Sequence, residues 1–83
     1  MIFVYVLQSI NRNYIYVGLT NDFNRRLEEH QSLKNKTTRA YSPFSVILIE
    51  TFKTRPEARK REKYLKSGVG KEFIKLLLIN QKS

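Results

Sequence analysis

The chain has 83 residues and a formal net charge of +9, from sixteen lysines and arginines against seven acidic residues. This length allows one domain with one modest core, which we expect to span residues 1–83. The lack of cysteine excludes a disulfide framework, and the single histidine argues against a structural zinc site. The positive charge favours a polyanionic partner, most often nucleic acid, over the alternative that it serves solubility alone.

Nothing in the sequence predicts contact with a membrane. No run approaches the roughly 20 apolar residues that cross a bilayer. The first segment, MIFVYVLQSINR, lacks the basic region and the small-residue cleavage site of a signal peptide. A cytoplasmic location is therefore the expectation.

The first two predicted elements are strands. Residues 2–8 (IFVYVLQ) and 14–20 (YIYVGLT) are rich in β-branched and aromatic side chains, and turn-forming residues separate them, so a hairpin is predicted. Both faces of both strands are apolar, which predicts that the sheet is covered on both sides. If the turn centres on residues 10–11, Tyr5 lies opposite Tyr16.

The remaining elements complete an α/β (α+β) pattern. Thr20 or Asn21 can cap a helix that ends near Gln31. Residues 32–43 are polar and basic, and residues 44–52 (FSVILIETF) predict the most apolar strand.

A second helix should follow, with Thr54 as its cap, Pro56 at the first helical position and Glu57 completing a capping box. It should end at Lys66, and residues 71–80 (KEFIKLLLIN) predict a last amphipathic helix. The order β-β-α-β-α-α predicts a small antiparallel or mixed sheet flanked by helices.

Helical periodicity selects particular charged residues in the first predicted helix. Because a helix turns about 100° per residue, Phe23, Arg26, Leu27 and His30 share one stripe, whereas Arg25 falls outside it. We therefore expect Arg26 and His30 to face the sheet. The alternatives are an arginine that lays its stem on the core and a histidine that only packs.

Glu62 occupies a comparable position in the second predicted helix. It shares a stripe with Ala58, Arg61 and Leu65, so it is expected among residues that face the sheet. A carboxylate placed there requires a cation or hydrogen-bond donors. It could form a salt bridge with Arg26 or Arg61, or it could bind Mg²⁺, which is commonly held by one carboxylate, phosphate and water. The spacing leaves both alternatives open.

Tyrosines and a glycine complete the candidate site. Tyr5, Tyr14 and Tyr16 lie in the predicted hairpin, where packing alone could explain them. Gly18 weakens a strand interior unless another group must come close. A phenol, a guanidinium, an imidazole and a carboxylate together can cleave a phosphodiester. A free tyrosine has a pKa near 10, so nearby cations would have to lower the pKa of a tyrosine that acts as a base.

Three segments resemble the GIY-YIG nuclease superfamily: FVYVLQS, YIYVGLTNDFNRRLEEH and EARKREKYLKSG. The resemblance runs from Phe3 to about Phe73 and is strongest to small stand-alone bacterial members, which are similar to the N-terminal catalytic domain of the excision-repair nuclease subunit UvrC. It implies a three-stranded antiparallel sheet flanked by helices. It also implies an endonuclease that hydrolyses DNA with one divalent metal, Mg²⁺ or Mn²⁺, in repair or recombination.

The same resemblance assigns the site residues. Glu62 would bind the metal, Arg26 would stabilise phosphate charge, and His30 would orient a tyrosine or relay a proton to it. Either Tyr5 or Tyr16 would activate water. Gly18 would allow substrate or a helix to approach. The proposed catalytic set is thus Tyr5, Tyr16, Arg26, His30 and Glu62.

Two other functions remain open at this stage: a non-catalytic nucleic-acid-binding module, and a subunit of a repair complex. In either, basic residues would hold phosphates without sequence preference; the candidates are Lys34, Lys36, Arg39, Arg59 and Lys60. An inward-facing carboxylate would repel phosphate, which favours the enzyme. The apolar last helix could form a homodimer face, although packing on the sheet is the expected role.

Overall fold

The computed structural model describes residues 1–32 and 35–82. Three strands, β1 (Ile2–Ser9), β2 (Ile15–Thr20) and β3 (Phe44–Phe52), form one antiparallel sheet in the order β2-β1-β3. The central strand β1 is buried throughout its middle, from Val4 to Leu7. The predicted α+β fold with a small antiparallel sheet is confirmed.

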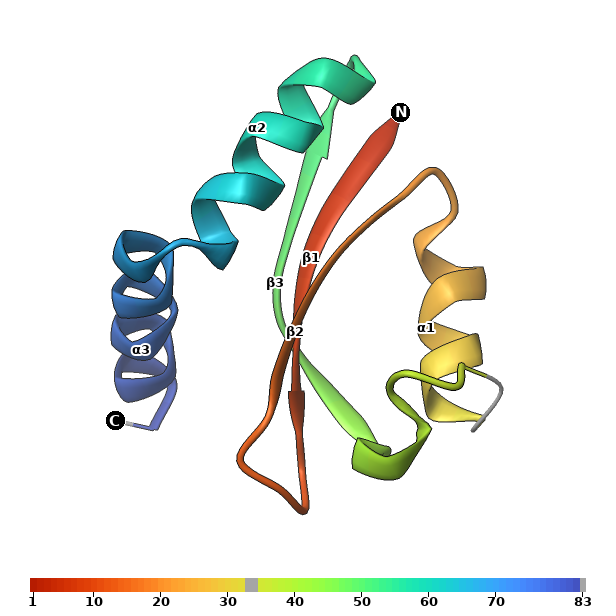
Figure 1. Ribbon diagram of the computed structural model, residues 1–83, viewed down its shortest axis with the longest axis vertical. Coiled ribbons are helices and arrows are strands. Elements are labelled where there is room, and N and C mark those ends of the chain that lie inside the picture. The colour runs from red at the N-terminus through yellow and green to blue at the C-terminus, as the bar shows by residue number, and fades with distance from the viewer. Residues whose placement is uncertain (33–34, 83) are drawn as a thin grey trace.

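Helices cover both faces of this sheet, as its apolar faces require (Figure 1). Helix α1 (Phe23–Gln31) lies on one face, and α2 (Arg55–Lys66) with α3 (Gly68–Lys82) lies on the other. On the α2 side, Val4 and Val6 pack with Leu65, while on the α1 side Tyr5 and Leu7 form a separate cluster. The alternation of side chains along β1 thus supplies two cores.

The hairpin register differs from the expectation. Tyr5 pairs with Gly18, and Tyr16 pairs with Leu7, so the expected pairing of Tyr5 with Tyr16 is wrong. The cause is a longer connection, in which the Ser9 N–H donates to the Tyr14 carbonyl at 2.9 Å. The difference is two residues, so every side chain keeps its expected face, and Tyr5 and Tyr16 are diagonal neighbours.

Helix α1 begins one or two residues later than expected. Its cap is Asp22, whose Oδ1 accepts a hydrogen bond from the Arg25 N–H at 3.2 Å. Thr20 is still part of β2, and its hydroxyl accepts from the Asp22 N–H at 3.0 Å. Thr20 and Asn21 were therefore the wrong caps, because the turn between strand and helix uses them.

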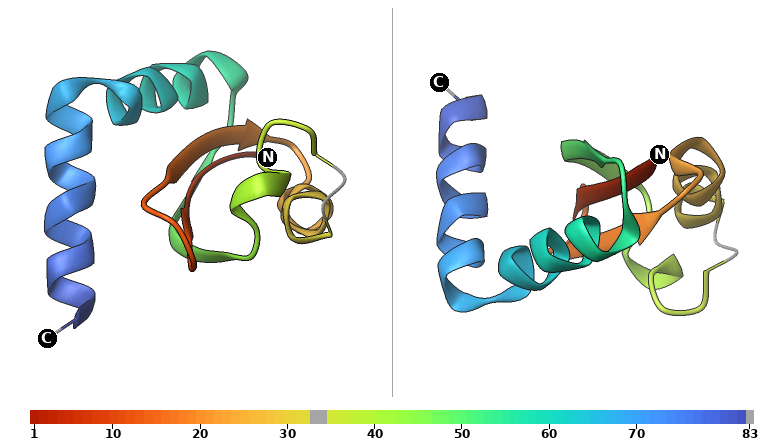
Figure 2. Two further views of the ribbon diagram at one scale, coloured as in Figure 1. Left: turned by 60° about the horizontal axis from the view of Figure 1, so that its bottom comes forward. Right: turned by 90° about the horizontal axis from the view of Figure 1, so that it is seen from above.

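The second helix follows the expectation more closely. Thr54 caps α2, and its hydroxyl donates to Oε1 of Glu57 at 2.9 Å. Helix α2 ends at Lys66, as predicted, but α3 begins at Gly68 rather than near residue 71. A Cβ at Gly70 would overlap the backbone of Tyr64 and Leu65, so glycine is what allows α3 to start against the end of α2. Figure 2 shows α3 turning sharply away from the axis of α2.

Strand β3 lies at an edge of the sheet, although its sequence is the most apolar of the three. It pairs with β1 only, and its side chains Val46 and Ile49 are 39% and 43% exposed.

Among the described residues, no helix is long and apolar enough to cross a membrane.

Candidate active site

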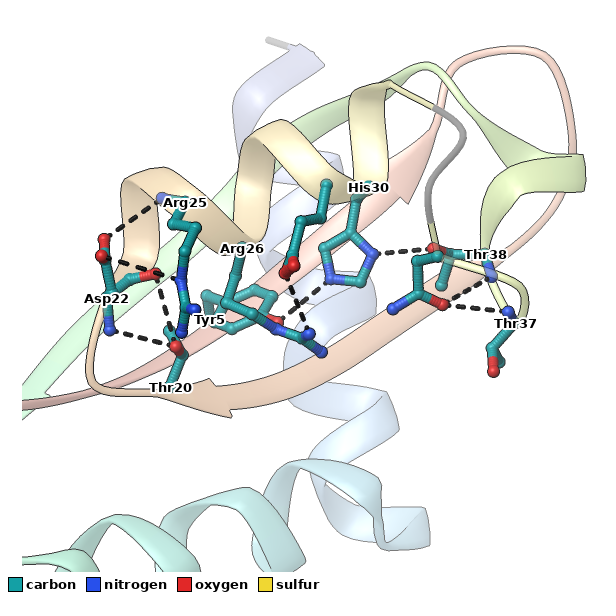
Figure 3. Close-up of polar contacts among 10 residues, drawn as sticks. Tyr5, Thr20, Asp22, Arg25, Arg26, His30, Thr37 and Thr38 are labelled. Atoms are coloured by element: carbon teal, nitrogen blue, oxygen red, sulfur yellow. Dashed lines mark hydrogen bonds and ion pairs between the residues drawn. The ribbon is translucent and has the colours of Figure 1, made fainter.

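A buried pair of polar rings lies at the centre of the α1 face. Tyr5 comes from the central strand and His30 from the last turn of α1, and both are 0% exposed. Their Oη and Nε2 atoms are 3.2 Å apart, within hydrogen-bond distance (Figure 3). The helical face predicted for His30 is therefore confirmed, and the ring contacts the sheet tyrosine expected from the sequence.

Arg26 reaches the same place from α1, one turn before His30. Its guanidinium forms an ion pair with Glu29 at 3.2 Å and lies close enough to the Tyr5 phenol to affect the pKa of that group. Figure 3 shows Arg26 and His30 extending from the helix toward Tyr5. The neighbouring Arg25 is 64% exposed and pairs with the capping Asp22. The sequence-based choice of Arg26 over Arg25 as the inward-facing residue is confirmed.

Burial determines how these groups ionise. Burial, together with the neighbouring Tyr16, raises the pKa of Tyr5 to about 12, and Arg26 opposes this rise. The condition that cations lower the pKa of a tyrosine acting as a base is therefore not met at Tyr5, because burial raises the pKa by more than Arg26 lowers it. Burial, followed by the charge of Arg26, lowers the pKa of His30, so its imidazole is neutral at pH 7.

Tyr16 sits beside this pair on the edge strand β2 and is half-buried. Its ring centroid is 4.8 Å from that of His30 and 6.1 Å from that of Tyr5. A Cβ at Gly18 would overlap Cζ and Oη of Tyr5 and would lie 2.9 Å from Cε1 of Tyr16. Within the structure, the group that approaches Gly18 is thus the phenol of Tyr5 rather than a helix.

Glu62 lies on α2, on the opposite side of the sheet from α1. Its side chain is 14% exposed, and its Oε2 accepts a hydrogen bond from Lys66 at 3.3 Å. The salt-bridge alternative thus holds with a different partner: Glu62 pairs with Lys66 and not with Arg26 or Arg61. Arg61 instead holds Glu50 of β3 through two hydrogen bonds of 2.7 and 3.1 Å. The structure thus brings together Tyr5, Tyr16, Arg26 and His30, and holds Glu62 separately.

The donor set limits how a metal could be held. Within residues 1–32 and 35–82, no group of three or more histidine, aspartate or glutamate side chains gathers around one point. Glu62 alone offers a partly buried carboxylate whose partner is an exposed lysine. One carboxylate completed by phosphate and water fits Mg²⁺, which gives up its waters reluctantly.

The basic residues divide into predicted and unpredicted groups. Lys36, Arg39, Arg59 and Lys60 are exposed, and the prediction at Lys34 lies outside the described residues. A groove of about 750 Å³ between the hairpin, α2 and α3 is lined by three further lysines and by Tyr16; the lysines are Lys66, Lys71 and Lys75. Sequence reasoning missed them, although residues four apart on a helix, such as Lys71 and Lys75, share a face.

Thr38 is the other residue that the sequence analysis missed. It is 0% exposed, and its Oγ1 lies 2.7 Å from Nδ1 of His30. Asn35 holds the segment by accepting from the N–H groups of Thr37 and Thr38 at 2.9 and 3.3 Å. An asparagine that bonds the backbone two and three residues on was the available signal.

The sheet order, the flanking helices and the Tyr-Tyr-Arg-His cluster agree with a match to a known family. The family model of the GIY-YIG catalytic domain matches residues 1–74, so the chain belongs to the GIY-YIG nuclease family.

Individual relatives are proteins of the UPF0213 group. YazA of Bacillus subtilis is 35% identical over 81 residues, which cover 96% of this chain and 79% of that protein. A Clostridium perfringens relative is 33% identical over 84 residues, covering 100% and 87%. A Bacillus velezensis relative is 44% identical over 61 residues, covering 72% of this chain and 61% of its own length.

A solved structure is also similar. The solution NMR structure of the UPF0213 protein BH0048 from Bacillus halodurans has a TM-score of 0.55 and 33% identity, and the match covers 93% of this chain and 85% of that one. The names of these relatives state no activity, so the family is established while the reaction is a matter for proposal.

Proposed function

We propose that this protein is an endonuclease that hydrolyses DNA phosphodiester bonds with Mg²⁺ or Mn²⁺. The observation that carries the proposal is the buried Tyr5–His30 pair with Arg26 and Tyr16 beside it. Burying a phenol and an imidazole beside a partly buried guanidinium is costly compared with an apolar core of the same volume. Packing alone gives no reason for such a cluster, whereas phosphodiester cleavage uses each of these groups.

The geometry favours Tyr16 over Tyr5 as the residue that accepts the proton of the attacking water. Tyr5 is fully buried and its pKa is raised to about 12, so it keeps its proton and has no access to water. Tyr16 lies on the edge strand and is only half-buried. Tyr5 lies beside Tyr16, with 6.1 Å between their ring centroids, so the proton that Tyr5 keeps would be available to stabilise the phenolate that forms on Tyr16.

Arg26 would bind the non-bridging oxygens of the scissile phosphate. These oxygens gain charge as water attacks phosphorus, and a guanidinium is suited to two of them at once. Arg26 is 30% exposed, so one side of it faces solvent while the other contacts Tyr5. Glu62, which lies on the other side of the sheet, would hold the metal, and a bound metal would supply Lewis-acid stabilisation of phosphate charge. Lys66 would leave Glu62 when the cation binds.

The charged surface offers a path for the nucleic acid. The groove lined by Lys66, Lys71 and Lys75 includes Tyr16, so it adjoins the place where cleavage would occur. Lysines along such a groove bind the backbone without reading the bases. Binding of this kind predicts weak sequence preference. The proposal further includes a cytoplasmic enzyme that acts on DNA in repair or recombination. A deletion strain exposed to DNA damage would test that role.

The decisive experiment is nicking of supercoiled plasmid with Mg²⁺, Mn²⁺ or chelator. Wild type should nick only with metal. Arg26→Ala should lower the rate by about 10²- to 10³-fold, as for loss of one preorganised donor, and Glu62→Gln should abolish metal-dependent cleavage. Arg25→Ala is the matched control, because Arg25 is the adjacent, exposed arginine, and it should nick like wild type.

A comparison of the two phenols tests the assignment of the base. Tyr16→Phe should lose more activity than Tyr5→Phe, and the reverse order would reassign the base to Tyr5. If the plasmid stays supercoiled under all conditions while DNA is still bound, catalysis is rejected. The non-catalytic binding module or repair-complex subunit, which the lysine-lined groove also fits, would then take its place.

A further inference from the structure

Thr38 has no assigned part in the proposed reaction, yet it is as buried as the histidine it contacts. Both residues are 0% exposed. Among the contacts of the described residues, the Thr38 hydroxyl has one partner, Nδ1 of His30, at 2.7 Å. The other ring nitrogen, Nε2, faces Oη of Tyr5 at 3.2 Å. Thr38 therefore stands at the far end of a chain of hydrogen bonds that leads through His30 to Tyr5.

The direction of these bonds follows from counting donors. A neutral imidazole has one N–H and one acceptor nitrogen, whereas a hydroxyl both donates and accepts. If Nδ1 carried the proton and donated to Thr38, the buried Thr38 hydroxyl proton would have no acceptor among its described contacts. If the hydroxyl donates to Nδ1, its proton is satisfied, and the imidazole N–H lies at Nε2. Leaving a buried donor unpaired costs about 1–3 kcal/mol, which selects the second arrangement.

We propose that Thr38 is a positioning residue: its hydroxyl donates to Nδ1 of His30, holds the imidazole in the Nε2–H tautomer, and directs that N–H at Oη of Tyr5. Tyr5 then accepts from His30, and its own proton is free to turn toward the neighbouring Tyr16. The chain of donors thus runs from the buried threonine to the buried phenol of Tyr5, which lies beside the half-buried Tyr16. The effect on catalysis rests on the proposed function, whereas the tautomer itself does not.

The segment that carries Thr38 is anchored well enough to hold an orientation. Asn35 accepts from the backbone N–H groups of Thr37 and Thr38. A few residues on, the Tyr41 ring stacks on Tyr14 of the hairpin at 3.8 Å between centroids and 9° between planes, and the Tyr41 carbonyl accepts from Ser9 at 2.6 Å. The hydroxyl is therefore fixed from both sides.

The first test is nitrogen NMR of the His30 imidazole in the intact protein, which needs no activity. The single histidine makes the assignment unambiguous. We expect a protonated Nε2 and an unprotonated Nδ1 shifted by a hydrogen bond. Thr38→Val, which has nearly the same shape without the hydroxyl, should remove that shift, and Thr38→Ser should retain it. Thr37→Val is the matched control, because Thr37 is exposed, and it should change nothing.

Several outcomes would overturn the proposal. A proton found on Nδ1 in wild type would reverse the direction of the chain, and an unchanged Nδ1 resonance in folded Thr38→Val would remove Thr38 from it. In nicking assays, Thr38→Val should lower kcat by about 10- to 100-fold with KM unchanged, a smaller effect than the largest losses seen when an acid–base group is removed. Thr38→Ser should restore kcat. A wild type with the Nε2–H tautomer but no nicking would refute the endonuclease while leaving the tautomer assignment standing.

Discussion

Replacing Gly18 by alanine is a direct test of how the site is packed. The added Cβ would overlap the end of the Tyr5 ring and would lie 2.9 Å from Cε1 of Tyr16. Tyr5 is fully buried in the central strand and cannot move into solvent. The clash must therefore be relieved by shifting the ring, and with it the hydrogen bond that Tyr5 makes to His30.

The expected magnitude follows from two opposing terms. Overpacking a well-packed core costs about 1–3 kcal/mol. Replacing glycine in a strand returns roughly 0.5–1 kcal/mol, because alanine loses less backbone entropy on folding. The net loss of unfolding free energy should be about 1–2 kcal/mol, and for a domain of this size each kcal/mol lowers Tm by about 4–8 °C. We expect a Tm lower by roughly 5–15 °C.

Thermal unfolding followed by circular dichroism measures this loss, and a second glycine supplies the control. Nothing lies within 4 Å of a Cβ built at Gly68, so Gly68→Ala should leave Tm unchanged or raise it slightly. Combining Gly18→Ala with Tyr5→Leu, which removes the end of the ring, should cancel most of the loss. Two results would refute the packing argument. One is a Gly18→Ala protein with the Tm of wild type, and the other is a Gly18→Ala substitution that lowers Tm as much in the Tyr5→Leu protein as in the wild type.

Other predictions concern charge and pH. Because the pKa of Tyr5 is about 12 when folded and near 10 when unfolded, stability should fall by about 2 kcal/mol as pH rises from 10 to 12, and Tyr5→Phe should lack that loss in urea titrations. Since the folded pKa of His30 is lowered, stability should also fall as pH drops below about 6.5, a dependence that His30→Gln should remove. Arg61→Lys should cost about 1–2 kcal/mol in the same titrations despite keeping the charge, because lysine cannot form the two-point contact with the β3 carboxylate; equal stability would refute this. Lys71→Ala should lower the slope of log K against log salt concentration for duplex binding by about 0.9, measured by fluorescence anisotropy. Lys53→Ala, outside the groove, should leave this slope unchanged. Equal slopes for the two variants would exclude the groove as the binding path.

Most of the fold could be predicted because its signals are local. β-Branched and aromatic runs mark all three strands, and the Thr54–Glu57 pattern marks the start of α2. What depends on neighbours in space could not be predicted. The hairpin register depends on a connection whose length several turn residues allow, and the exposure of β3 depends on its edge position, which its own apolar sequence does not encode.

The candidate site shows the same division. Helical periodicity identified Arg26 and His30 because one face of α1 meets the sheet. It could not identify Thr38, because residues 32–43 have no hydrophobic period from which burial could be inferred. The partner of Glu62 could have been predicted from the sequence, because Lys66 lies four residues later on the same helix, a spacing that favours ion pairs.

The place of Tyr5 on the central strand has a dynamic consequence. Strand β1 is hydrogen-bonded on both sides, so its amides should exchange with solvent only when the whole domain unfolds, while edges and chain ends open at lower cost. A site anchored there has no low-energy route to partial opening. We therefore expect motions of the site to involve β2 and α1. Substitutions at Tyr16 or Arg26 can therefore change the site without changing the stability of the central strand. Any substitution at Tyr5, in contrast, changes the stability of the entire molecule.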